Sequence, residues 1–447
     1  MIDVEALKKI IKPLTANEED RPTAFHILDF YYKKAKEIPE YEALGELAMK
    51  CEYRGMVLKC AENSYIMART QEQLMNARRN LCSVYNALNM PEKALFYNNI
   101  NLEIEPDSFD FQLTRAYNLA LMNRREESEE VIESLIAKDP KQEENIRFGL
   151  SGKLLREGKT TEGIMNFIDT FKPKSELFED IMKMKKWNGI AMPGSTLYVN
   201  GEGGIGDEII NIRFFKHIED LGMKPILYSP WHNYRPDIVD LFIRNGYDVL
   251  CEHYSIDRTK PWIHMMSIPG YMGLQEKDLW KGTYLTPMRQ KKNNLKSKKF
   301  KIGIKCEGNP YFSQNVYRSI PIETMLEYIP KNDNVEIYFF DKELTYPGTI
   351  AMKDKLDTWE DTLDYIDQMD VIVSSCTSIV HAAGAIGKTT CVIVPIAEYY
   401  VWTSSRRDNH TPWYGDNFYV MKQTKVRSWD EPLQEMQTLV NKMIQDK

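Results

Sequence analysis

The sequence contains three segments whose residue types suit anion binding or proton transfer, and the first is the glycine-rich stretch 201–207, GEGGIGD. It follows a short β-rich run and opens a predicted helix. Its glycines let a ligand approach the backbone, and the first amides of the helix point outward. The stretch lacks the full GxGxxG spacing with a late acid that favours a dinucleotide, and it has no GK[ST] of a P-loop. It therefore predicts a binding turn without naming the ligand.

Asp207 is the residue of this stretch that could do chemistry. In the first turn of a helix the helix dipole stabilises a carboxylate as an anion, which is a purely structural role. Facing a cleft, the same carboxylate could take a proton from a hydroxyl group. Position alone leaves both roles open.

The second segment is 374–378, SSCTS, followed by His381. Hydroxyl groups at the start of a helix could simply cap it. Together with free backbone amides they also make a phosphate pocket. His381 falls one turn into the predicted helix, beside the same pocket, although a single histidine is more often a core or capping residue.

The third segment, 307–321, contains Arg318. This arginine could pair with a diphosphate through a charge-assisted fork, or it could form a surface salt bridge. The sequence has no DxD carboxylate pair at a strand end and no HExxH, so a metal-bridged diphosphate is not indicated. A leaving diphosphate would then be stabilised by Arg318, the helix N-terminus and the hydroxyl groups, which points to metal-free chemistry.

Short apolar runs alternate with helical patterns from residue 195 onward, and this alternation must position the three segments. It predicts two α/β domains with parallel sheets, joined by a flexible segment at 290–301. Ligands of such sheets lie outside the carboxyl ends of the strands, here in a cleft between the domains. The predicted strands are 195–201, 224–230, 247–252, 300–308, 334–341, 371–378 and 389–395, and the predicted helices are 201–222, 235–246, 320–330, 358–370 and 378–387.

The first half repeats itself with a period of 34 residues, which is the tetratricopeptide signature. Two antiparallel helices are predicted in 77–106 and again in 111–140, with weaker copies at 43–72 and 145–173. About four such pairs would stack into a solenoid whose concave face binds a peptide or another domain, with a rigid spacer or dimerisation surface as the alternative. The residues predicted to be buried are Leu81, Tyr85, Ala94, Tyr117, Leu121, Val131 and Leu135.

The composition is that of an ordinary globular chain: 447 residues, 43% of them hydrophobic, and a formal net charge of −7. The acidic balance argues against a generic nucleic-acid coat, although 290–301 holds six lysines and could touch phosphates. No long apolar run suggests a signal peptide or a membrane span. Seven scattered cysteines without a CxxC pair fit a reducing compartment, so we expect a cytoplasmic protein.

Several motifs in a fixed order give the sequence a family resemblance. They are GEGGIGDEI (201–209), HMMSIPG (264–270), YLTP (284–287), GIKCEGNP with RSIP (303–321), DVIVSSCTSIVHAAGAIGK (370–388) and TPWY (411–414). This order resembles that of bacterial and phage tetratricopeptide-repeat proteins with a C-terminal GT-B glycosyltransferase domain, similar to heptosyltransferases and O-linked N-acetylglucosamine transferases. The resemblance covers about residues 45–430.

The resemblance implies roles for individual residues. Asp207 matches the proposed general base, and His264 lies in the motif near the acceptor; both are assigned here as catalytic residues. Arg318 matches the residue that holds the donor phosphates. The residues assigned to donor binding are Gly204, Gly206, Asn309, Arg318, Cys376, Thr377, Ser378, His381 and Trp413.

Two features modify this picture. Relatives usually carry an aspartate before the threonine of the phosphate-binding turn, where this sequence has Cys376. That departure leaves the donor sugar open and raises the alternative of a non-catalytic site. Trp402, Trp413 and Tyr414 could stack on a nucleotide base or a sugar ring, although aromatic residues by default pack.

The expected protein is therefore a tetratricopeptide-like α-solenoid (1–185) followed by a GT-B unit of two Rossmann-like α/β domains, 186–292 on the acceptor side and 293–447 on the nucleotide-sugar side. We expect a metal-independent, inverting glycosyltransferase that uses a nucleotide-diphosphate sugar and no other cofactor. The acceptor is a glycan, a peptide or a hydroxylated DNA base, and a protein partner on the repeats and a homo-oligomer stay open. The alternative is an inactive scaffold that binds a protein and a nucleotide.

Overall fold

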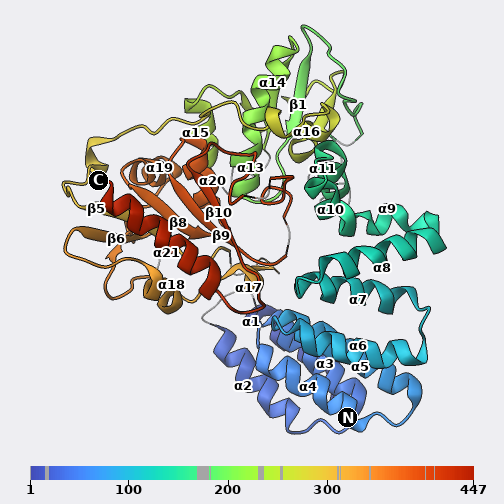
Figure 1. Cartoon of the computed structure of the whole chain (residues 1–447). Coiled ribbons are helices and arrows are strands. Elements are labelled where there is room, and N and C mark those ends of the chain that lie inside the picture. The colour runs from blue at the N-terminus through green and yellow to red at the C-terminus, as the bar shows by residue number, and fades with distance from the viewer. Residues whose placement is uncertain are drawn as a thin grey trace. The chain divides into compact units, whose positions relative to one another are not determined.

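The computed structural model describes the chain except for residues 1, 16–19, 169–180, 182, 230–235, 252–254, 310–311, 313, 342–343, 398 and 407. The chain divides into two compact units, Met1–Pro140 and Lys141–Lys447. The first unit is helical, and the second contains both sheets (Figure 1). Among the described residues, no helix is both long and apolar enough to cross a membrane.

The first unit is a series of helical hairpins in which neighbouring helices pack against each other. The start of α5 is fixed by a capping box, in which Thr70 and Gln73 bond each other's backbone N–H. The described helices are α1 (Val4–Leu14), α2 (Arg21–Tyr32), α3 (Ile38–Lys50), α4 (Arg54–Met67), α5 (Gln71–Ala87), α6 (Pro91–Ile104), α7 (Phe109–Leu121) and α8 (Arg125–Lys138).

The same turn recurs between the helices of successive hairpins. Asn89 and Asn123 both adopt a left-handed conformation, with φ of 56° and 61°, which asparagine tolerates better than most residues. These asparagines lie one 34-residue period apart, and each follows the C-cap of its helix. The predicted helix pairs of 77–106 and 111–140 are therefore present, while their stacking as a tetratricopeptide solenoid stays a prediction.

The predicted buried faces are correct for the first pair and partly wrong for the second. Leu81, Tyr85 and Ala94 are buried in the core of the unit. Tyr117, in contrast, is 44% exposed, because α7 turns Phe111, Ala116 and Leu119 inward and residue 117 lies off that face. In α8 the predicted Leu135 is buried, whereas Val131 is only half-buried and Ile132 takes the inward position beside it.

The second unit begins with α9 (Glu143–Ile146), α10 (Ser151–Arg156) and α11 (Thr160–Ile168), and continues into a parallel sheet of strand order β3-β2-β1-β4. The predicted helix 201–222 is interrupted by a 3-10 turn. The elements of this part are β1 (Thr196–Asn200), α13 (Ile205–Asn211), η5 (Ile212–Phe214), α14 (Phe215–Asp220), β2 (Lys224–Tyr228), α15 (Pro236–Arg244), β3 (Val249–Leu250), β4 (Trp262–His264), η7 (Met265–Ser267) and α16 (Ile268–Tyr271).

A second, larger parallel sheet has the order β10-β9-β8-β5-β6-β7. Helices α18 and α21 cover one of its faces, and α19 and α20 cover the other (Figure 1). Its elements are β5 (Phe300–Lys305), α17 (Asn315–Arg318), α18 (Ile322–Tyr328), β6 (Val335–Phe339), β7 (Ile350–Ala351), α19 (Trp359–Asp367), β8 (Val371–Ser375), α20 (Ser378–Ala385), β9 (Thr390–Val394), β10 (Phe418–Lys422) and α21 (Asp430–Gln445).

The lysine-rich segment between the two sheets differs from the flexible linker that we predicted. Asn293 is buried, and its amide donates hydrogen bonds to Asp361 and Asp364 on α19. Backbone amides at 289 and 290 also donate to Asp364, and the amide of Leu295 donates to Gln368. The polar side chains of α19 and of the residue that follows it therefore fix the first part of this segment in place.

Candidate functional site

The two sheets each change strand order at one place, and the predicted site residues lie there. In the smaller sheet the change falls between β1, which leads into the 201–207 turn, and β4, which ends at His264. In the larger sheet it falls between β5 and β8, which lead to Arg318 and to the 374–378 turn. Such switch points open a crevice at the carboxyl ends of parallel strands.

Helices α13 and α20, which follow these two switch points, pack against each other. The contact depends on Gly206, since a Cβ there would lie 2.9 Å from Cδ2 of His381 and 3.4 Å from Cα of Ser378. This close approach brings the glycine-rich turn and the hydroxyl-rich turn together. Gly206 thus serves helix packing in this structure, in addition to any role toward a ligand.

Asp207 is held by hydrogen bonds to both of its carboxylate oxygens. Its Oδ2 accepts the backbone N–H of Gly204 at 2.7 Å, and its Oδ1 accepts the hydroxyl of Tyr399 at 2.6 Å. Burial raises the pKa of Asp207, while these two bonds and the nearby charge of Arg318 act in the opposite direction. Asp207 is therefore a fixed carboxyl group that ionises less readily than usual.

Arg318 reaches from the end of α17 to the turn after β8. Its Nη1 donates to the carbonyl oxygen of Cys376 at 2.8 Å, and its Nε donates to Asn315 at 3.1 Å. A side chain at position 308 would collide with the guanidinium, so Gly308 makes room for it. This arrangement places a cation at the hydroxyl-rich turn and within electrostatic range of Asp207.

The hydroxyl-rich turn opens α20 without a side-chain cap. Thr377 occupies the N-cap position, but its Oγ1 lies 3.1 Å from Oγ of Ser374 and caps no amide. Ser378 is the first residue of the helix. The first-turn amides of α20 are therefore not used by the N-cap side chain, which leaves them suited to an anion.

Cys376 and His381 are both tied to the aromatic segment after β9. Sγ of Cys376 accepts the indole N–H of Trp402 at 2.9 Å. The ring of His381 stacks on Trp402 with centroids 5.3 Å apart, and its Nδ1 lies 2.8 Å from the Tyr414 hydroxyl. Burial and two nearby arginines lower the pKa of His381 to about 3, so the ring is neutral at physiological pH and adds no charge to an anion site.

Trp413 lies in the core, where its ring packs edge-on against Phe214 and Tyr400. The neighbouring Arg213 is also buried, and it donates to the carbonyl oxygens of Ile210, Leu279 and Trp413. Trp413 therefore has the packing role that aromatic residues take by default. Asn309 is exposed in the loop after β5.

His264 ends β4 beside Asn200 of β1, as the strand register requires. Its Nδ1 lies 3.3 Å from Oε2 of Glu202 and 3.2 Å from Nδ2 of Asn200. The other Glu202 oxygen accepts the N–H of Met266 at 3.1 Å. Asp207 contributes to the pKa shift of Glu202, so this pair belongs to the same region as the predicted base.

Sequence reasoning missed Glu202, Tyr399 and Arg213 as residues of this region. Glu202 stands inside the glycine-rich stretch, so its acid type next to Asp207 was a usable signal. Tyr399 and Arg213 meet their partners across 192 and 200 residues of sequence, and no local pattern reports such contacts.

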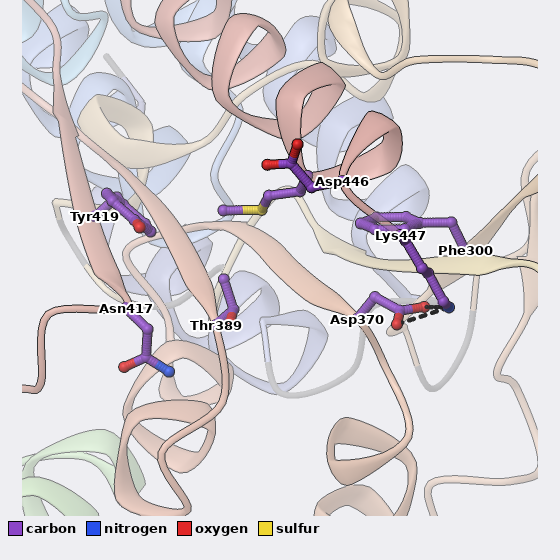
Figure 2. Close-up of a pocket in the computed structure, with 8 residues that line it drawn as sticks. Phe300, Asp370, Thr389, Asn417, Tyr419, Asp446 and Lys447 are labelled. Carbon is purple, nitrogen blue, oxygen red and sulfur yellow. Dashed lines mark hydrogen bonds and ion pairs between the residues drawn. The ribbon is translucent and has the colours of Figure 1, made fainter.

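A hollow of about 370 Å³ lies elsewhere, at the amino-terminal edge of the larger sheet (Figure 2). Figure 2 shows Asp370 in it, paired with the ammonium of Lys447 at 2.8 Å, and Thr389 and Asn417 on the neighbouring strand ends. None of the predicted site residues lines this hollow. It is on the opposite edge from the switch point.

No protein-family model matches the chain, and no curated protein matches it. Among solved structures, a family 9 glycosyl transferase from Veillonella parvula is similar at 9% identity with a TM-score of 0.42, over 58% of this chain and 100% of that chain. The ADP-heptose lipopolysaccharide heptosyltransferase II of E. coli is similar at 11% identity with a TM-score of 0.36, over 56% and 99%.

An O-GlcNAc transferase from Thermobaculum terrenum is similar at 10% identity with a TM-score of 0.33, over 100% of this chain and 94% of that chain. At these identities and scores the likenesses assign no role to any residue. The role of each side chain follows from its own contacts.

Proposed function

We propose that the chain is a metal-independent, inverting glycosyltransferase of GT-B architecture that moves a sugar from a nucleotide-diphosphate sugar to an acceptor hydroxyl. The observation that carries this proposal is the meeting of the two switch points. It brings a carboxyl group with a raised pKa, Asp207, within electrostatic range of the cation Arg318 at an uncapped helix start. A base and an anion cradle at one place are what transfer from a diphosphate requires.

In the proposed reaction Asp207 takes the proton of the acceptor hydroxyl while the oxygen attacks the anomeric carbon. The bond from that carbon to the diphosphate breaks on the opposite face, so the configuration inverts. The nucleoside diphosphate leaves with the electron pair. Its charge is stabilised by Arg318 and by the first-turn amides and hydroxyl groups at Thr377 and Ser378.

The same proposal assigns the remaining parts of the chain. The hairpins of the first unit form a tetratricopeptide-like solenoid that presents a protein or peptide, and the part around 186–292 holds the acceptor. The part around 293–447 holds the donor. The charge of Arg318 and the start of α20 supply the stabilisation that a metal gives in other enzymes, which supports a reaction that tolerates EDTA.

The test combines a donor screen with a matched pair of variants. The purified chain is incubated with a panel of nucleotide sugars, with and without EDTA, and both binding and slow donor hydrolysis are measured. Asp207→Asn should abolish turnover while nucleotide affinity stays within a few-fold. The control Asp240→Asn, at an exposed position on α15, should retain both. Full activity in Asp207→Asn would remove this residue from the mechanism.

A second candidate function, a non-catalytic scaffold, is favoured by one observation. Position 376 carries a cysteine whose sulfur accepts the Trp402 N–H, so no carboxylate stands at that point of the turn. Failure of every nucleotide sugar to bind at millimolar concentration would favour the scaffold. Selective binding of one donor would exclude it.

A further inference from the structure

Glu202 and His264 form a buried polar pair that the proposed reaction leaves without a task. They come from the carboxyl ends of β1 and β4, on the side of the molecule that the proposal gives to the acceptor. Their side chains are 9% and 11% exposed, and Oε2 of Glu202 lies 3.3 Å from Nδ1 of His264. Buried groups of this kind are kept in place only when they are well bonded.

The contacts of the pair leave one ring atom for a ligand. Nδ1 of His264 faces both Glu202 and Asn200, and the ring packs edge-on against Trp262 at 4.8 Å. Within the described residues, Nε2 has no hydrogen-bond partner. Because a carboxyl group that bonds one imidazole nitrogen fixes the orientation of the ring, the other nitrogen is presented in a defined direction.

Burial disfavours a charge on either member of the pair. Burial raises the pKa of Glu202 to about 8 and lowers that of His264 to about 4, so both favour their uncharged forms near neutral pH. The titratable groups that act on the pair are Asp207, Lys186 and Tyr400, and the carboxylate of Glu208 lies beside Gly201 at the end of β1.

We propose that Glu202 and His264 form an acceptor subsite, in which Nε2 of His264 binds a neutral hydroxyl group and Glu202 positions the ring. A hydroxyl suits this nitrogen because it donates to an unprotonated ring atom and accepts from a protonated one. An acidic group is unsuitable, since Asp207 lies close by. The identification of the bound compound as the acceptor rests on the proposed function. The binding of a hydroxyl compound at His264 can be measured independently of that function.

The experiment uses the full chain with isotope-labelled histidine, and NMR records the ring nitrogens of His264, assigned with His264→Gln. Three neutral hydroxyl compounds serve as ligands: a methyl glycoside, an acetylated and amidated serine peptide, and a 5-hydroxymethylated pyrimidine nucleoside. We expect one of them to shift the Nε2 resonance in a saturable way and to identify the source of the hydroxyl. Resonances of His26, which is exposed on α2, should stay unchanged.

The positioning role of Glu202 has its own readout. Glu202→Gln should alter the Nδ1 resonance of His264 and weaken the binding of the responsive compound about tenfold, the size of one hydrogen bond. Circular dichroism shows whether the variant is folded. If the variant is unfolded, the NMR titration of the unsubstituted chain with the three hydroxyl compounds still tests whether the subsite binds. The affinity for nucleoside diphosphate should change less than twofold, since the anion cradle lies on the other sheet.

Two outcomes separate this proposal from the proposed function. Nucleotide binding without any response of His264 to the three compounds overturns the acceptor subsite and leaves the glycosyltransferase intact. A His264 response without nucleotide binding supports the hydroxyl site and overturns the glycosyltransferase. An Nδ1 resonance that is indifferent to Glu202→Gln overturns the pairing.

Discussion

The hydroxyl of Tyr399 donates a 2.6 Å hydrogen bond to Oδ1 of Asp207 from a segment 192 residues further along the chain. The ring of Tyr399 packs edge-on against Phe167 of α11, with centroids 5.1 Å apart. The candidate base is therefore oriented by a residue of the larger sheet's last loops, and this residue is itself supported by a helix that precedes both sheets. The orientation of Asp207 therefore depends on three parts of the second unit that are distant in sequence: α13, the segment around Tyr399, and α11.

Removal of this hydrogen bond should move the pH dependence of turnover. The bond favours the charged form of Asp207, so Tyr399→Phe raises the pKa of that carboxyl further. A general base must be deprotonated, so the acid limb of the pH profile should shift upward by about one unit, with activity lost at neutral pH and recovered at higher pH. The matched control is Tyr328→Phe, whose hydroxyl donates to Asp430 on α21 instead. Equal profiles for both variants would contradict the role of Tyr399.

Arg318 should distinguish diphosphates from other nucleotides. Arg318→Lys keeps a positive charge but loses the planar fork that bonds Asn315 and the Cys376 carbonyl. We expect nucleoside diphosphate affinity to fall by about tenfold or more and nucleoside affinity to change little. Calorimetric titration of both ligands measures the difference. Arg406→Lys, at an ion pair with Asp408 in a surface loop, is the control. A parallel loss for nucleoside and diphosphate would refute phosphate recognition by Arg318.

Arg213 should matter for stability rather than for ligand binding. It is buried, donates to three backbone carbonyl groups, and lies 4.6 Å from the ring of Tyr284 and 4.7 Å from that of Tyr414. Arg213→Met leaves those carbonyl groups without donors, so the free energy of unfolding should fall by about 3 kcal/mol. Urea denaturation followed by tryptophan fluorescence tests this. A change below about 0.5 kcal/mol, as expected for a surface site, would show that the carbonyl groups find other donors.

The hydrogen bonds of Glu40 should make the stability of the first unit depend on pH. Its carboxylate accepts backbone N–H groups of Ile2, Lys36 and Glu37, and these bonds hold the pKa of Glu40 below its usual value. A carboxyl group with a lowered folded pKa stabilises the fold above its ordinary pKa, and the stabilisation is lost as the pH falls through the lowered value. Glu40→Gln should therefore lower the urea midpoint at pH 7 and have a smaller effect at pH 3. An equal effect at both pH values would contradict this, with the exposed Glu46→Gln as control.

The sequence pattern was sufficient for the elements that carry long or regular signals. Alternating apolar runs predicted β1, β2, β5, β6, β8 and β9, and the 34-residue period predicted the hairpins around Asn89 and Asn123. Because Asp207 and Arg318 lie in segments that follow predicted strands, and Thr377 lies at the end of one, the parallel arrangement alone predicted that they lie at carboxyl ends. The structure places them there.

Other features could not be predicted because they depend on tertiary contacts. Strand β4 is three residues long, too short for a period, and yet it places His264 beside Asn200. The segment after residue 289 reads as a solvated linker from its lysines. Its fixed position follows from Asp361 and Asp364, which lie about 70 residues away on α19.

The hydrogen bonds of Arg213 limit how one sheet of the second unit could be replaced by the corresponding sheet of another protein. The guanidinium of Arg213 joins the carbonyl group of Ile210, at the end of α13, to those of Leu279 and Trp413. The buried cluster around this cation therefore contains backbone from segments next to both sheets. A chimera that takes only one sheet from another protein would inherit an incomplete cluster. The two α/β parts should therefore be engineered as one module.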